Sequence, residues 1–128
     1  MNNQMSLVAI CKEYGLSRRA IQGYEQLGLV KPAGKNKYGY LLYDEDTVYR
    51  ILFIKHLQNI GFTLKEITSF IDEPNEVIKE NLKKKVPELE TSINKTKNLL
   101  SNSKKIIESL DQEDYKEKIY QITKKENI

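Results

Sequence analysis

The sequence of 128 residues contains one cysteine, one histidine and no tryptophan. Cys11 and His56 alone cannot form a disulfide framework or a Cys/His metal cage, and no second histidine or cysteine is available for a nucleophile–base pair. The glycines occur singly, so a glycine-rich phosphate-binding loop is absent. Asp44, Glu45 and Asp46 stand at a predicted helix start, where capping and the helix dipole explain them. The sequence therefore predicts no enzyme, no metal site and no cofactor.

Long apolar runs and a strong charge of one sign are also missing. The apolar run at 51–54 is far too short to cross a membrane. Residues 1–4 carry no basic or apolar leader pattern, so no signal peptide is expected. Because 21 Lys and Arg face 18 Asp and Glu, the net charge is only +3, and binding to nucleic acid would need local clusters of cations. We expect a cytoplasmic protein with no membrane association.

The distribution of glycine divides the chain. All six glycines lie between residues 15 and 61, and residues 73–128 contain none. Glycine punctuation predicts short elements joined by tight turns, and its absence from a charged segment favours a long helix. The sequence thus predicts three parts, which are a head over 1–73, a linker and dimerisation helix over 74–110, and a short tail over 111–128. The spacing of Tyr115, Ile119 and Ile122 predicts that the tail is an amphipathic helix docked on the dimer seam. The alternative is a ligand pocket between the tail and the seam.

The head is predicted to contain four short helices and a β-hairpin. The first helix covers 7–14 and ends at Gly15, and Ser17 caps the second, which covers 18–27 and stops at Gly28. Their inward residues are predicted to be Leu7, Ile10, Cys11, Tyr14, Ala20, Ile21 and Tyr24. The remaining elements are a loop over 32–36, a hairpin over 37–43, a helix over 45–60 between Asp44 and Gly61, and a fourth helix opened by a capping box at Thr63 and Glu66.

Residues 82–110 repeat with a period of seven. One heptad position holds Val86, Ile93, Leu100 and Ile107, and the complementary position holds Leu82, Leu89, Thr96, Ser103 and Leu110. A straight helix over 86–110 spans roughly 37 Å at the standard rise, too long for a small head to cover its apolar stripe. The pattern predicts pairing with a second copy of the chain. The predicted dimerisation residues are Val86, Leu89, Ile93, Leu100, Ile107 and Leu110.

Pro87 interrupts this pattern. Proline removes a backbone donor and disfavours helical geometry at the preceding residue. We therefore expect a break, with a separate short helix over 76–85 capped by Asn75 and the long helix beginning near Pro87.

The second helix of the head carries the most informative side chains. A helix, the turn Gly15–Ser17 and a further helix form a helix–turn–helix, which projects its second helix outward. Arg18, Arg19 and Gln22 on that helix can hydrogen-bond to guanine, to adenine or to phosphate in the major groove. These charges alone are equally consistent with a solvated helix face. A second cluster favours DNA, because it interleaves cations and tyrosines on the hairpin arm: Lys35, Lys37, Tyr38 and Tyr40.

Three segments, at 15–30, 39–43 and 61–67, are similar to motifs of the MerR family of bacterial transcription regulators. They resemble its recognition helix, its wing and the start of its second wing, in the family's order and spacing. The resemblance covers residues 5–72 and implies a mainly α fold. That fold is a winged helix–turn–helix head followed by a long helix, which pairs as an antiparallel coiled coil in a homodimer.

The resemblance also implies a sequence-specific regulator that binds an inverted-repeat promoter operator as a dimer. Such a regulator distorts double-stranded promoter DNA so that RNA polymerase can engage both promoter elements. The resemblance implies contacts from Arg19 and Tyr24, from Tyr40 on the wing, and from Thr63 and Lys65 at a helix start suited to phosphate. With the residues argued above, the predicted DNA-binding set is Ser17, Arg18, Arg19, Gln22, Tyr24, Lys35, Lys37, Tyr38, Tyr40, Thr63 and Lys65.

Three departures from the family pattern affect this interface. The family usually has Arg, Tyr and Arg where this chain has Gln22, Gly23 and Leu41. The loss of two cationic groups predicts a different operator and a weaker dependence on salt. Cys11 is interpreted as a core residue and His56 as a surface or core-edge residue, so the effector stays unidentified. The alternative function is a coiled-coil adaptor whose head binds protein and does not read DNA.

Overall fold

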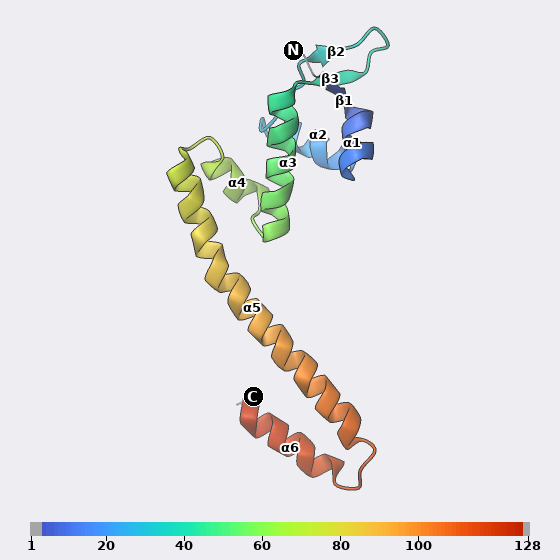
Figure 1. Cartoon of the computed structure of the whole chain (residues 1–128), viewed down its shortest axis with the longest axis vertical. Helices are drawn as coiled ribbons and strands as arrows, with labels where there is room; N and C mark the ends of the chain where they lie inside the picture. Colours follow the sequence, from blue (N-terminus) through green and yellow to red (C-terminus); the bar gives the residue numbers. More distant parts are fainter. Residues whose placement is uncertain (1–3, 127–128) are drawn as a thin grey trace. The chain divides into compact units, whose positions relative to one another are not determined.

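The computed structural model describes residues 4–126 in two compact units, which divide between Ile78 and Lys79 within one helix (Figure 1). Each unit is described by itself. The first unit contains β1 (Met5–Ser6), α1 (Leu7–Tyr14), α2 (Arg18–Gln26), β2 (Gly34–Lys35), β3 (Leu41–Tyr43), α3 (Glu45–Ile60), α4 (Leu64–Phe70) and the first turn of α5 (Asn75–Ser109). The second contains the rest of α5 and α6 (Tyr115–Glu126). The predicted fold class, mainly helical with a small head and a long helix, is confirmed.

Local side chains fix where the helices of the head begin. The Ser17 hydroxyl accepts a hydrogen bond from the Ala20 N–H at 3.0 Å, and the Asp44 carboxylate accepts one from the Thr47 N–H at 2.8 Å. These oxygens satisfy N–H groups that have no partner inside the helix. Ser6 caps α1 in the same way. The predicted starts of α2 and α3 are confirmed.

Glycine in the left-handed region ends these helices, as predicted. Gly15 follows α1 at φ 68°, Gly28 follows α2 at φ 75°, and Gly61 follows α3 at φ 120°. A side chain at these angles would clash with its own backbone, and glycine avoids that penalty. The turns therefore follow directly from the sequence.

The core of the head is apolar and continuous across its helices. Phe62 and Phe70 meet edge to face with ring centroids 5.2 Å apart. The expected inward position of Tyr14 is wrong, because this side chain is 42% exposed. Leu16, in the turn that follows, is only 7% exposed and enters the core instead. The other fully or nearly buried apolar residues are Leu7, Ile10, Ile21, Tyr24, Leu29, Val30, Tyr43, Val48, Ile51, Ile54, Leu57, Ile67, Ile71 and Ile78.

The hairpin is part of a three-stranded antiparallel sheet in the order β1-β3-β2. β3 pairs with β1 through Met5 opposite Tyr43, and with β2 through Lys35 opposite Leu41. The predicted loop over 32–36 is wrong at Gly34–Lys35, which form strand β2. Strand β1 was not predicted from the sequence. Strands of two residues are too short to show an alternating pattern, so only their backbone partners define them.

Pro87 lies inside a continuous α5, so the predicted break and the separate helix over 76–85 are wrong. A proline within a helix removes only one backbone donor, and the remaining hydrogen bonds of a 35-residue helix persist on either side. One ion pair spans the position, and a second side-chain contact is made to Pro87 itself. Lys85 and Glu88 form an ion pair at 3.2 Å, and the Thr91 hydroxyl donates to the Pro87 carbonyl at 2.9 Å.

The second unit pairs α6 with the last turns of α5, as Figure 1 shows. On α5, the residues that face α6 include Asn102 and Lys105, while Leu100 and Ile107 stay 56% and 65% exposed. Asn102 lies about 200° around the helix from Leu100. The expectation that the tail docks on the predicted seam is therefore wrong, and α6 covers the opposite face. Within residues 4–126, no helix is both long enough and apolar enough to cross a membrane.

Candidate nucleic-acid interface

Helix α2 presents its polar side chains outward because its apolar side chains anchor it. Ile21 is fully buried and Tyr24 is 1% exposed, whereas Arg18, Arg19 and Gln22 are exposed. Buried and exposed positions alternate with the helical period, so one face is fixed to the core and the other is free. The structure therefore leaves three polar side chains of the predicted recognition helix in solvent.

The hairpin arm is shaped by a tight turn over 36–40. The Asn36 side-chain oxygen accepts hydrogen bonds from the N–H groups of Tyr38 at 2.9 Å and Tyr40 at 3.0 Å. Gly39 supplies the left-handed geometry that closes the turn, at φ 82°. Lys37 lies over the Tyr38 ring, 5.1 Å from its centroid. The two tyrosines are 70% and 55% exposed, which is typical of side chains that contact a partner.

The recognition helix and the arm border one hollow of about 260 Å³. Arg18 and Gln22 enter it from α2, and Lys35 and Tyr40 enter it from the arm. The other lining residues are Leu7, Val8, Gly39 and Leu41. The structure thus brings four predicted contact residues together, from two segments of the sequence. Two cations beside an amide and a phenol suit a groove edge and its phosphates.

Tyr24 is not available for the contact that the resemblance implied. Its side chain is buried, and its hydroxyl donates to the Gln58 side-chain oxygen of α3 at 2.6 Å. Burial raises the pKa of Tyr24 above its ordinary value. We therefore correct that expectation. The Tyr24 side chain attaches the recognition helix to α3 and is not part of the predicted DNA-binding surface.

A second buried tyrosine attaches α2 to the sheet. The hydroxyl of Tyr43, in β3, donates to the carboxylate of Glu25 in α2. Burial first, and then this hydrogen bond to Glu25, raise the pKa of Tyr43. Together the two tyrosines hold the helix from two sides. Their roles had no local signal, because each partner is distant in sequence.

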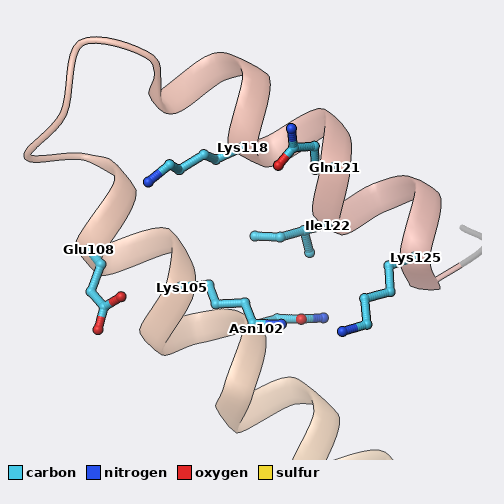
Figure 2. Close-up of a pocket in the computed structure, with 7 residues that line it drawn as sticks. All are labelled: Asn102, Lys105, Glu108, Lys118, Gln121, Ile122 and Lys125. Atoms are coloured by element: carbon cyan, nitrogen blue, oxygen red, sulfur yellow. The ribbon is translucent and has the colours of Figure 1, made fainter.

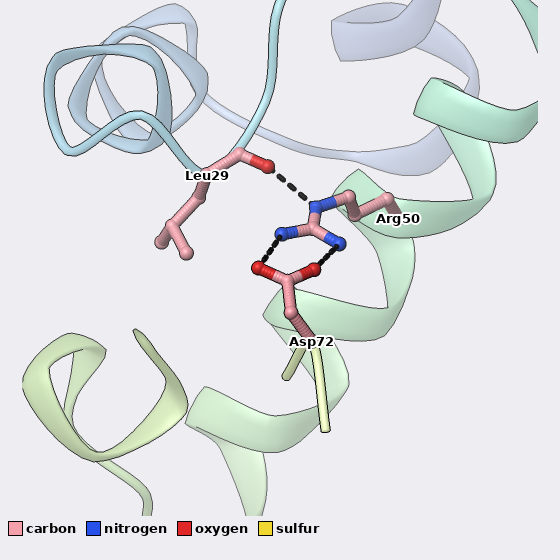
Figure 3. A network of polar contacts seen from close by, with 3 residues as sticks. All are labelled: Leu29, Arg50 and Asp72. Carbon is pink, nitrogen blue, oxygen red and sulfur yellow. Dashed lines mark hydrogen bonds and ion pairs between the residues drawn. The ribbon is translucent and has the colours of Figure 1, made fainter. Parts of the chain in front are cut away.

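Arg50 joins three parts of the head (Figure 3). Its Nε donates to the Leu29 carbonyl after α2, and its two terminal nitrogens donate to the Asp72 carboxylate after α4 at 2.7 and 3.2 Å. The hydrogen bonds to Arg50 lower the pKa of Asp72. This fork-shaped pairing is a geometry that arginine provides and lysine does not. Sequence reasoning missed it, since Arg50 and Asp72 are separated by 22 residues.

The start of α4 is partly engaged by its own capping box. The Thr63 N–H donates to the Glu66 carboxylate at 3.0 Å, and the Glu66 N–H donates to the Thr63 hydroxyl at 3.1 Å. The predicted capping box is confirmed. Both Thr63 and Lys65 are exposed, but neither lines the hollow between α2 and the arm. Arg19, Lys37 and Tyr38 are also exposed outside that hollow.

Residues typical of metal sites do not gather in the part of the chain that the structure describes. Over 4–126, no group of three His, Cys, Asp or Glu side chains could hold a metal ion. Cys11 is half-buried on α1, so the expected full burial is only partly met, and His56 is exposed on α3.

Comparison with known proteins identifies the family. The protein-family model described as MerR HTH family regulatory protein matches residues 5–73 of the sequence. A second family model, described as MerR, DNA binding, matches residues 48–102. The chain belongs to the MerR family. This family consists of DNA-binding transcription regulators and not of enzymes, so those two predictions are confirmed. MerR-family regulators bind promoter DNA as dimers.

Two curated relatives show the range of similarity to this MerR-family chain. A probable heavy metal-dependent transcriptional regulator of Haemophilus influenzae is 37% identical over 79 residues, which are 59% of this chain and 62% of that protein. The mercuric resistance operon regulatory protein of Bacillus cereus is 40% identical over 57 residues, 44% and 43% of the two chains. This chain therefore matches only 43% to 62% of the length of these relatives.

Solved structures show the same fold as this MerR-family chain. A MerR-family regulator from Bacillus cereus superposes with a TM-score of 0.69 at 22% identity, over 87% of this chain and 85% of that one. HiNmlR, a MerR family regulator lacking the sensor domain and bound to promoter DNA, superposes with a TM-score of 0.65 at 20% identity, over 82% and 90%. At these identities the likeness establishes the fold alone.

Proposed function

We propose that this MerR-family chain binds an inverted-repeat promoter operator as a homodimer and distorts the DNA. The observation that carries the proposal is the hollow between α2 and the arm, where Arg18, Gln22, Lys35 and Tyr40 converge. The outward side chains of α2 enter the major groove, and the arm holds the adjacent phosphates. The relative HiNmlR, which lacks the sensor domain, was solved bound to promoter DNA.

The proposed DNA-binding set omits only Tyr24, which is buried. Arg18, Arg19 and Gln22 contact base edges or phosphates, and Ser17 fixes the start of their helix. The remaining contacts are to the backbone, from Lys35, Lys37, Tyr38, Tyr40, Thr63 and Lys65. Gln22 has the donor and acceptor arrangement that pairs with adenine. The operator is therefore proposed to place an adenine opposite Gln22.

The proposed dimer forms through α5. Val86, Leu89, Ile93, Leu100, Ile107 and Leu110 are each between 43% and 65% exposed in the single chain. Leu89 and Ile93 lie side by side in a shallow hollow that Ser92, Thr96 and Lys97 also line. The simplest partner for an exposed apolar stripe on one helix is the same stripe of a second copy of the chain. We propose that the two helices are antiparallel and related by a twofold axis. The proposed domains are the head (1–73), the dimerisation helix (74–110) and the tail (111–128).

Regulation is proposed to act through the shape of the DNA. Two heads on one dimer contact two half-sites, and bending or untwisting the DNA between them changes how RNA polymerase meets its promoter elements. The deformation costs a few kcal/mol, which the added protein contacts offset. This activity places the protein in the cytoplasm, where promoter DNA is found.

The test is a gel-shift titration of the intact chain against DNA selected from a random pool, at two salt concentrations. We expect enrichment of an inverted repeat and an affinity that falls as salt rises. Arg18→Ala and Lys124→Ala provide a matched pair, because each removes one cation and only Arg18 lies on α2. A dimer that enriches no sequence at low salt would refute the proposal and favour the adaptor function.

A further inference from the structure

A second hollow, of about 290 Å³, lies between α5 and α6 within the second unit (Figure 2). It is separate from the proposed DNA surface, since none of its residues belongs to the head. The lining residues are Asn102, Lys105 and Glu108 of α5, and Lys118, Gln121, Ile122 and Lys125 of α6. The volume is close to the lower end of the range for small-molecule sites.

The side of α6 that borders the hollow carries two lysines, Lys118 and Lys125. Lys118, Ile122 and Lys125 follow the spacing of one helix face, and Figure 2 shows all three directed toward α5. Ile122 and the neighbouring Ile119 are half-buried, so α6 does carry apolar packing residues. Lys118 is half-buried as well, whereas Lys105 and Lys125 are exposed. Packing through the isoleucines does not account for a half-buried lysine beside two further lysines.

The positive charge in this hollow is not balanced by the chain. Lys105 adds a third cation, while Glu108 is the one carboxylate in the lining and points away from α6 in Figure 2. Within residues 4–126, none of the three lysines forms an ion pair with a carboxylate, and Lys118 donates to the neutral side chain of Gln112. Like charges gathered in a concave site focus a positive potential, which attracts an anion.

We propose that this hollow binds a small organic anion with two charged groups, phosphate or carboxylate. The lysines act as point charges for the anionic groups. Asn102 and Gln121 offer carboxamides for a hydroxyl or amide of the ligand, and Ile122 packs against its carbon atoms. A duplex does not fit between the two helices, so the observations favour a small molecule over DNA.

The experiment is isothermal titration of the intact chain, without DNA, with inorganic pyrophosphate and with succinate at constant ionic strength. We expect one site per chain for at least one of the two anions. The anion that binds with the lower dissociation constant identifies phosphate or carboxylate as the preferred group. Because no DNA is present, failure of operator binding would not alter this readout.

Paired variants distinguish specific binding in this hollow from nonspecific attraction of anions to lysines. K118Q/K125Q should weaken binding at least tenfold, whereas K116Q/K124Q, which removes two exposed lysines from the same helix, should leave it unchanged. N102D, which adds a carboxylate to the hollow, should also weaken binding and tests the site without altering α6. The absence of saturable binding, or equal losses in the two lysine pairs, would overturn the proposal. Loss of DNA affinity in K118Q/K125Q without anion binding would overturn it too.

Discussion

At the scale of single residues, contacts on the inward face of α2 set what its outward face can do. Tyr24 binds Gln58, and Tyr43 binds Glu25, so two buried hydroxyls fix the rotation of the helix about its axis. A helix anchored at two points presents its outward arginines in a defined direction. Such preorganisation lowers the entropy lost when DNA binds.

Replacement of Arg19 by alanine should weaken operator binding by about 1–3 kcal/mol if the guanidinium contacts a base. Arg19 is exposed and forms no hydrogen bond or ion pair within residues 4–126, so the head should keep its stability. Gel shifts on the selected operator and on scrambled DNA measure the effect. An equal loss on both DNAs would assign Arg19 to phosphate, and no loss on either would remove it from the interface.

Replacement of Asp72 by asparagine should reduce the stability of the head at neutral pH by less than about 1 kcal/mol, because the pair with Arg50 is largely solvated. Folding lowers the pKa of Asp72 from 3.8, so the carboxylate stabilises the head above that pH and loses its contribution as the pH falls through the lower value of the folded state. Urea unfolding at pH 7 and at pH 3 should therefore show a smaller difference between wild type and variant at pH 3.

Glu73→Gln is the control for this measurement, since it removes the adjacent carboxylate, which has no ion pair in the described chain. A difference for Asp72→Asn that stays constant between the two pH values would show that the ionised pair contributes nothing.

At the scale of elements, helix α5 continues through Pro87, although proline locally disfavours a helix. Proline disfavours helix at this position, yet the heptad pattern continues on both sides of Pro87. Interrupting the helix would end one continuous apolar stripe, whereas continuing it costs one backbone hydrogen bond and a steric clash of the proline ring with the preceding turn.

Pro87→Ala should raise the thermal midpoint of the chain, because proline costs about 3 kcal/mol relative to alanine in a helix interior. Circular dichroism at matched protein concentration measures the midpoint. Ser101→Ala, at an exposed position of the same helix, should produce a much smaller rise. An unchanged or lower midpoint for Pro87→Ala would show that the proline geometry is needed in the assembled dimer.

At the scale of the whole molecule, the two sides of α5 have different partners. One side carries the exposed stripe that we assign to a second copy, and the other carries α6. The proposed anion site therefore does not compete with the proposed dimer for the same face.

Ile93→Asp should convert the dimer to monomers, because it places an unpaired charge in an apolar seam. Sedimentation velocity at several concentrations measures the change. Asn94→Asp introduces the same charge one residue along, about 100° around the helix, and should remain dimeric. A dimer that survives Ile93→Asp would place the interface elsewhere.

Local chemistry in the sequence determined where the helices of the head begin and end. Ser17, Asp44, Thr63 and the three helix-ending glycines act on neighbours within a few residues, so the bounds of α2, α3 and the start of α4 could be predicted. The motifs at 15–30, 39–43 and 61–67 likewise carry the resemblance to the MerR family, because each is a short run of adjacent residues. The convergence of Arg18 and Gln22 with Lys35 and Tyr40 depends on sheet pairing, so it exists only in the folded chain.

Tertiary structure decided what the pattern of the sequence left open. The spacing predicted Tyr24 inward and the resemblance predicted it at the DNA, and only the folded chain shows its hydrogen bond to Gln58, 34 residues away. Arg50 likewise needs both Leu29 and Asp72 brought beside it. The position of α6 on the far side of the seam depends on the turn after α5, and it creates a cationic hollow that no spacing rule describes. Contacts between distant residues carry no local signal, because the chain must close a loop before they exist.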